Sequence, residues 1–234
     1  ALPILLCYRA HEVSPFVDVA PDRRAAIDRL SALFHLAQGL PFRFLVAPLS
    51  ALARRVPPRE AVLRRSMVVT AEEEVDREAL IDVLVEGGYL RVPVVEDPGT
   101  FAVRGGLIDI YPPGAPQPAR IELDDWLVLS IKRFDPDDQR TLDAVPELRV
   151  HPVRDALRGG EELARARERV REICDDMDLP TRRTKQLLDD LESGRLYLGV
   201  EAYLPAFYPA LDSLFDYLPR DIGAVVLDPT AAVR

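Results

Sequence analysis

Residues 87–140 read GGYLRVPVVEDPGTFAVRGGLIDIYPPGAPQPARIELDDWLVLSIKRFDPDDQR. Short apolar and β-branched runs alternate in this stretch with glycine, proline and aspartate. The runs cover 89–95, 101–104, 107–111, 120–123 and 126–134. Because runs of this length between turn residues are typical of β-strands, the stretch predicts a meandering, mostly antiparallel sheet.

Two arginines in this predicted sheet need an explanation. Successive side chains of a strand point to opposite faces, so Arg104 lies on the face opposite Val103. By the same alternation Arg120 and Glu122 share one face, whereas Ile121 points to the other. A sheet with one buried face and one solvated face produces this pattern.

The residues alone leave two interpretations of these arginines open. In the first, both are solvated side chains that pair with Glu122 or Asp109. In the second, they belong to a docking face, where planar guanidinium groups bind carboxylates of a partner protein. The alternation of side chains is the same in both cases and does not choose between them.

Several motifs occur in order across this region, namely Gly-Tyr-x-Arg-Val at 88–92, Pro-Gly-Thr-Phe-Ala-Val-Arg-Gly-Gly at 98–106, Ile-Asp-Ile-Tyr-Pro-Pro at 108–113, Arg-Ile-Glu-Leu at 120–123 and Ser-Ile-Lys-Arg-Phe-Asp-Pro-x-x-Gln-Arg at 130–140. In sequence and spacing they resemble the UvrB-homology module. That module forms the N-terminal part of the bacterial transcription-repair coupling factor (Mfd) and of the excision-repair protein UvrB. Further matches lie at 14–30, 51–57 and 198–219, so the resemblance covers nearly the whole chain.

Two branches of this family can be told apart near the start of the chain. UvrB has a functional Walker loop and a long, tyrosine-rich hairpin between its first strands. The segment 8–23 is too short for that hairpin and lacks its tyrosine cluster. The resemblance is therefore to the coupling-factor branch, and a fragment of a UvrB-type excision-repair DNA helicase is the alternative.

The resemblance implies an α/β architecture in two parts. Residues 1–65 and 152–234 would form a degenerate helicase-like (P-loop-type) domain with a parallel sheet. Residues 66–151 would form an inserted β-rich α+β domain that docks the excision-repair ATPase UvrA. The family's UvrA-contacting arginines correspond to Arg104 and Arg120, and a neighbouring contact position that can be aromatic in relatives is Asp124.

The resemblance also implies a function. The chain would be an N-terminal fragment that acts as a non-catalytic adaptor and recruits UvrA to sites of stalled transcription in nucleotide excision repair. The parent protein resembles an ATP-dependent DNA translocase. ATP, Mg²⁺, RNA polymerase and DNA would be bound by its downstream domains, and we expect no cofactor in this fragment.

Composition favours a protein partner over nucleic acid. The 234 residues are 48% hydrophobic and 29% charged, and they carry a formal net charge of −9, whereas a DNA-binding domain usually presents a basic face. No apolar run is long enough to cross a membrane, and no signal peptide is visible. Cys7 and Cys174 lack metal-ligand spacing, so we expect a cytoplasmic protein with reduced thiols and no membrane partner.

Common motifs of catalysis are missing from the printed chain. No glycine is followed by lysine, which excludes the P-loop motif GxxxxGK[ST], and HExxH, GxSxG and CxxC do not occur. His11, His35 and His151 stand alone, and the adjacent carboxylates Asp124-Asp125 point in different directions. We therefore predict no catalytic group and no metal site.

Apolar patterns outside the predicted sheet indicate further elements. Helices are predicted over 23–38, 76–86, 161–177 and 181–193, and strands over 2–8, 42–47 and 67–70. The strand–helix–strand series at the start is typical of an open sheet with parallel strands. The aromatic-rich stretch 197–218 is interpreted as core packing, and 224–227 as another buried parallel strand.

Overall fold

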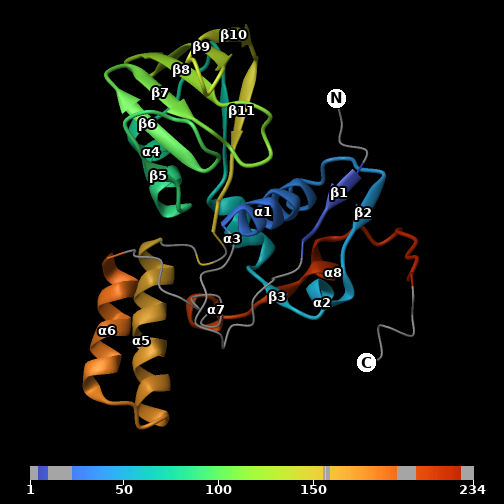
Figure 1. Cartoon of the computed structure of the whole chain (residues 1–234), viewed down its shortest axis with the longest axis vertical. Coiled ribbons are helices and arrows are strands. Elements are labelled where there is room, and N and C mark those ends of the chain that lie inside the picture. The colour runs from blue at the N-terminus through green and yellow to red at the C-terminus, as the bar shows by residue number, and fades with distance from the viewer. Residues whose placement is uncertain (1–4, 10–22, 155, 157–158, 194–203, 228–234) are drawn as a thin grey trace.

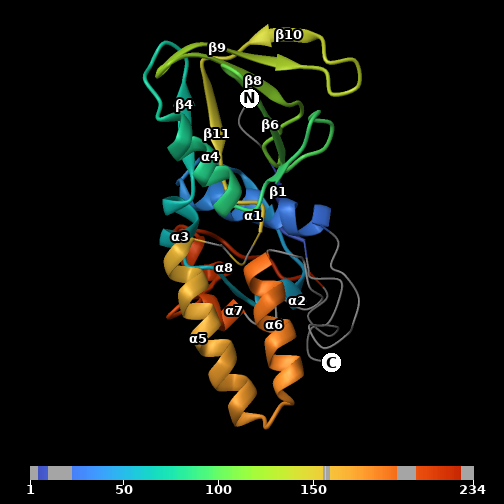
Figure 2. The same cartoon turned by 90° about the vertical axis from the view of Figure 1, so that its left-hand side faces the viewer.

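The computed structural model describes residues 5–9, 23–154, 156, 159–193 and 204–227. Three parts can be distinguished in Figure 1: a β-rich unit, a mixed α/β part around helix α1, and a helical hairpin. Figure 2 shows that the hairpin lies at the opposite end of the molecule from the β-rich unit. In the described ranges no helix has the length and hydrophobicity needed to cross a membrane.

The β-rich unit contains a six-stranded sheet with the spatial order β10-β9-β8-β7-β6-β5. Its strands are β5 (Leu90–Arg91), β6 (Thr100–Arg104), β7 (Leu107–Ile110), β8 (Ala119–Asp124), β9 (Leu127–Phe134) and β10 (Thr141–Ala144). All neighbours are antiparallel except β5 and β6, so the predicted meander is confirmed. The predicted strand over 89–95 is wrong in length, because Pro93 has no N–H to continue the ladder beyond β5.

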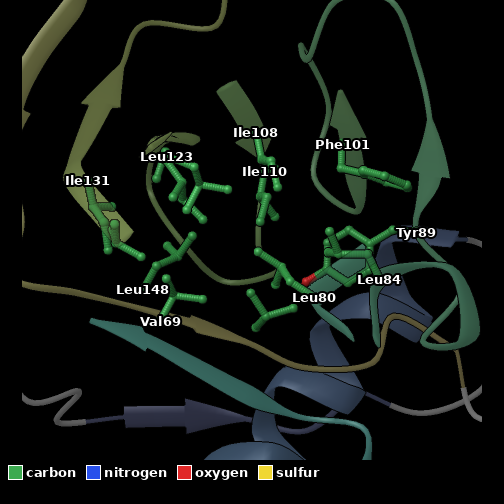
Figure 3. Packing of buried hydrophobic residues seen from close by; sticks show 14 of the residues in the cluster. Val69, Leu80, Leu84, Tyr89, Phe101, Ile108, Ile110, Leu123, Ile131 and Leu148 are labelled. Atoms are coloured by element: carbon green, nitrogen blue, oxygen red, sulfur yellow. The ribbon is translucent and has the colours of Figure 1, made fainter. Parts of the chain in front are cut away.

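One face of this sheet is covered by helix α4 (Arg77–Glu86) and by the antiparallel strands β4 (Met67–Thr70) and β11 (Glu147–Val150). Figure 3 shows side chains from the sheet, from α4 and from β4 and β11 converging in one core. Its largest fully buried members include Leu80, Leu84, Phe101, Ile108, Ile121 and Ile131. The Asp76 carboxylate caps α4 by accepting hydrogen bonds from the backbone N–H groups of Glu78 and Ala79 at 2.9 and 3.1 Å.

The mixed α/β part joins segments from both sides of the β-rich unit. Strands β1 (Leu5–Cys7) and β2 (Phe44–Val46) are parallel and pack on α1 (Arg23–Ala37), followed by α2 (Leu49–Leu52), β3 (Arg55–Val56) and α3 (Arg59–Arg64). After the β-rich unit, β12 (Asp212–Ser213) pairs with β3 and leads into α8 (Leu214–Tyr217). The Tyr217 hydroxyl donates to the carbonyl of Pro57 at 2.7 Å, and the Asp212 carboxylate accepts from the Arg59 N–H at 2.8 Å.

Helices α5 (Gly160–Asp176) and α6 (Thr181–Ser193) form the hairpin and pack with α7 (Leu204–Phe207) around a separate core. Both long helices were predicted from their apolar spacing, and both are confirmed. The buried stripe of α5 runs through Ala166, Val170 and Cys174, whereas the predicted member Met177 is exposed just beyond the helix end. Of the aromatic-rich stretch, 197–203 lies outside the described residues, Phe207, Tyr208 and Tyr217 are buried, and Phe215 is exposed.

One predicted strand is absent, and two others are less buried than predicted. Residues 224–227 form no strand, and Val225 is 87% exposed. A run of apolar residues becomes a strand only where another strand offers hydrogen-bond partners, and none of the described strands lies against this segment. The predicted strands around β1 and β2 do exist, but alternate side chains such as Leu5, Phe44 and Val46 are exposed. Among the described residues the pair is therefore covered on one face only.

An ion network ties the three parts together. Arg65, which follows α3, lies 2.7 Å from Glu86 at the end of α4 and 3.1 Å from Glu162 in the first turn of α5. Glu162 is buried, and Arg64 approaches it only to 3.6 Å from a largely exposed position. A Cβ atom on Gly159 would come within 1.8 Å of the Arg65 guanidinium, so glycine leaves the space that this contact needs.

Replacing Arg65 should destabilise the junction. Arg65→Ala leaves the buried Glu162 carboxylate without its closest partner, and we expect the free energy of unfolding to fall by about 3 kcal/mol. Arg64→Ala is the matched control, because its exposed and longer contact should be worth less than about 1 kcal/mol. Urea denaturation of both variants measures the difference, and equal effects would contradict the role of Arg65.

His151 joins the β-rich unit to α1. Its ring stacks on Phe34 with centroids 4.5 Å apart, and its nitrogens lie 3.0 and 3.3 Å from the carbonyl oxygens of Pro152 and Pro113. Burial lowers the pKa of His151 from 6.5 to about 4, because the charged ring would lose its hydration. The ring is therefore neutral in the folded protein at neutral pH.

This lowered pKa makes stability depend on pH. Between pH 6.5 and 4 the unfolded chain binds a proton at His151 that the folded chain excludes, so acidification favours unfolding. We expect this group to remove at most about 3 kcal/mol of stability by pH 4. His151→Phe keeps an aromatic ring against Phe34 and should show a flatter pH profile by urea denaturation across this window. Parallel profiles of the two proteins would exclude His151 as the source.

Candidate protein-docking site

The register of β6, β7 and β8 places the two arginines on one face of the sheet. Asp109 on β7 lies opposite Ala102 on β6 and opposite Arg120 on β8. Arg104 follows Ala102 by two residues and therefore shares its face. This face is turned away from the core that contains Phe101, Ile108 and Ile121. We call its members Arg104, Asp109, Arg120, Glu122 and Asp124 the arginine face.

Asp109 is the centre of the arginine face. The Arg120 Nε and Nη2 donate to its Oδ1 and Oδ2 at 2.7 and 2.9 Å, and the Arg104 Nη2 donates to the same Oδ2. Only 1% of Asp109 is exposed. The pairing with Asp109 that the first interpretation allowed is therefore confirmed, whereas Glu122 accepts a hydrogen bond from Ser130 at 3.1 Å and lies 3.8 Å from Lys132. The second interpretation, a docking face, stays a prediction.

The two guanidinium groups differ in exposure. Arg120 lies with its guanidinium carbon 4.7 Å from the centroid of the Phe134 ring, and its side chain is 23% exposed. Hydrogen bonding to the Asp109 carboxylate raises the pKa of Arg120, so the guanidinium stays charged. Arg104 is 47% exposed and has one hydrogen bond to Asp109. Arg120 is thus paired as expected but less exposed than a solvated side chain.

A small second core supports these side chains. Val95, Ala102 and Phe134 are fully or almost fully buried on the same side of the sheet, with Val92 and Tyr111 packed against them. The loop that follows β5 supplies Val95, and the Gln139 amide donates to its carbonyl at 3.2 Å. This loop therefore packs on the same side of the sheet as the arginine face, beside Ala102 and Phe134.

Apolar residues lie next to the arginine face. Asp124 ends β8 and pairs in register with Leu127, and Asp125 between them takes a positive φ of 56° in the tight turn. Trp126, Leu127 and Leu129 are exposed in and after this turn. Trp126 and Leu127 were predicted only as strand residues, because alternation does not reveal which apolar side chains stay exposed.

The structure places Arg104 and Arg120 on one face of the sheet, and Asp124 lies on the same face four residues further along β8. Within the described chain, Asp124 forms no ion pair with either arginine. The sequence indicated Asp109 only as one of two possible partners of these arginines. No group of three or more His, Cys, Asp or Glu side chains that could hold a metal ion occurs in the described part. The arrangement suits the binding of hydrogen-bond acceptors and carboxylates.

Comparisons with known proteins point to the same region. Residues 67–155, which run from β4 past β11, match the family model of the UvrB interaction domain. A transcription-repair-coupling factor from Myxococcus xanthus is 40% identical over 217 residues, which is 92% of this chain and 18% of that protein. The chain belongs to the transcription-repair-coupling factor family.

Other members of the family agree. The factor from Bacillus subtilis is 32% identical over 242 residues, covering 98% of this chain and 20% of that protein. The factor from Escherichia coli K12 is 29% identical over 211 residues, covering 90% of this chain and 18% of that protein. The resemblance inferred from the motifs is thus confirmed. The chain spans about a fifth of the length of these relatives.

The shared carboxylate predicts unequal effects of removing the two arginines. Arg104→Ala leaves Asp109 with two bonds from Arg120, so the free energy of unfolding should change by less than about 1 kcal/mol. Arg120→Ala removes both of those bonds and the contact with Phe134, and should cost about 3 kcal/mol. Arg133→Ala, on the opposite face of the sheet, should stay close to wild type. Urea denaturation checks this order, which similar losses for Arg104 and Arg120 would contradict.

Proposed function

We propose that this chain is a non-catalytic adaptor module that docks UvrA through the arginine face. In this role it recruits UvrA to sites of stalled transcription in nucleotide excision repair. The observation that carries the proposal is the cluster of Arg104, Asp109 and Arg120 on an open sheet surface, inside the segment that matches the UvrB interaction domain. Arg104, Arg120 and Asp124 are the proposed contact residues.

The chemistry of this surface supports a protein partner. Arginine and tryptophan are enriched among the residues that dominate binding energy at protein interfaces. Here half-exposed Arg104 lies on the same sheet as exposed Trp126 and Leu127. The net charge of −9 disfavours nucleic acid, whose phosphates attract basic surfaces. An acidic side chain bordered by apolar side chains on the UvrA side would complement Arg104, Arg120 and the exposed apolar residues beside them.

The arrangement of the chain supports a further part of the proposal. We propose that 66–151 is an inserted docking domain and that 1–65 and 152–234 are two segments of a degenerate helicase-like domain. The pairing of β3 with β12 and the hydrogen bond from Tyr217 to Pro57 support it, because they join the segments before and after the insert. The parallel pair β1 and β2 agrees with a remnant of a parallel sheet.

The ATP-dependent and DNA-binding activities of the whole protein belong, in this proposal, to regions outside this chain. We propose that ATP, Mg²⁺, RNA polymerase and DNA are bound by regions outside this chain, and that the chain itself binds no cofactor and turns over no ATP. The absence of a lysine after any glycine in the printed sequence supports this assignment. Measurable ATP hydrolysis by the purified chain would instead favour the UvrB-type helicase fragment.

Arg104→Ala is the sharpest test of docking. Because Asp109 keeps its bonds to Arg120, the variant should remain folded while its affinity for purified UvrA falls about tenfold or more. Calorimetric titration measures the affinity. Arg133→Ala is the control, since that arginine also bonds an aspartate but lies on the opposite face of the sheet. Unchanged binding by Arg104→Ala would refute the assignment of the arginine face.

A further inference from the structure

Asp109 occupies an unusual position for a charged residue. It lies on the open side of the sheet, yet it is 1% exposed because Arg104, Arg120 and the neighbouring strands enclose it. Burial of a carboxylate costs free energy unless charged donors compensate for the lost water. A buried ion cluster is seldom the most stable solution, since apolar residues of similar size often serve as well or better. Stability alone therefore does not account for an aspartate here.

The bonding pattern shows what Asp109 does for its neighbours. Each guanidinium has five N–H donors. Arg120 uses two of them on Asp109 and Arg104 uses one, so three and four donors remain, respectively. Arg120 is held in its plane by two bonds and on one side by the Phe134 ring. The remaining donors are thus offered from fixed positions, without the loss of side-chain freedom that a mobile arginine suffers on binding.

We propose that Asp109 is a positioning residue for docking: it orients both guanidinium groups in the free protein, so that their remaining N–H groups bind one acidic side chain of UvrA. This inference rests on the proposed function. Asp109 cancels one of the two positive charges, which leaves the cluster with a net charge of +1 that matches a single carboxylate. Asp109 itself touches no partner, because it is enclosed.

Free wild-type protein provides the first test, which needs no variant and no partner. In ¹H–¹⁵N NMR spectra, the Nε–H group of Arg120 should exchange slowly with solvent, because it is bonded to Asp109 and shielded by Phe134. The Nε–H group of Arg91, on an exposed position of β5, is the internal reference. Exchange of Arg120 as fast as that of Arg91 would overturn the proposal.

Asp109→Asn provides the second test. The amide keeps the size of the side chain but removes its charge, so Arg120 Nε–H should exchange faster and the affinity for UvrA should fall about tenfold or more. A merely structural role would alter unfolding and this exchange but leave the UvrA affinity of the folded variant unchanged. In the Arg104→Ala background, Asp109→Asn should weaken binding less than it does alone, because the two residues act through one another.

The outcomes distinguish docking through the arginine face from the positioning role of Asp109. If Arg104→Ala binds UvrA like wild type, the proposed function fails. If Arg104→Ala weakens binding while Asp109→Asn folds and binds like wild type, only the positioning role fails. If Asp109→Asn weakens binding equally in the presence and absence of Arg104, its effect does not pass through that arginine and the proposal is likewise overturned.

Discussion

The alternation of side chains along β6, β7 and β8 is the constraint on which the rest of this structure depends. One set of residues, including Phe101, Ile108 and Ile121, is buried against α4, β4 and β11. The other set necessarily points away from that core and contains Arg104, Asp109 and Arg120. The hydrophobic core and the arginine face are therefore two consequences of the same register, and a shift by one residue would destroy both.

The β-rich unit is attached to the remaining chain by polar contacts as well as by packing. Arg65 bonds acidic residues at the end of α4 and the start of α5, and His151 stacks on Phe34 of α1. The segments on both sides of the unit meet again where β3 pairs with β12. The sheet that bears the arginine face is thus anchored at its base, which suits a surface that must present charged groups in fixed positions.

Local patterns were sufficient to predict much of this fold and part of the site. The antiparallel meander, the helices α1, α4, α5 and α6 and the common face of Arg104 and Arg120 all follow from short-range spacing. The burial of Asp109 could not be predicted, because it depends on both arginines, which belong to two other strands, folding over the same carboxylate. The buried strand expected at 224–227 is wrong, because apolar character does not specify a partner strand.

Trp126 is the single tryptophan of the chain, and 54% of it is exposed in the turn between β8 and β9, next to Asp124. Its indole emission therefore comes from one known place beside the arginine face. A protein that covers this turn would remove water from the indole and shift its emission to shorter wavelengths. The molecule thus has a built-in optical reporter of events at this end of the sheet, in a position where no dye needs to be attached.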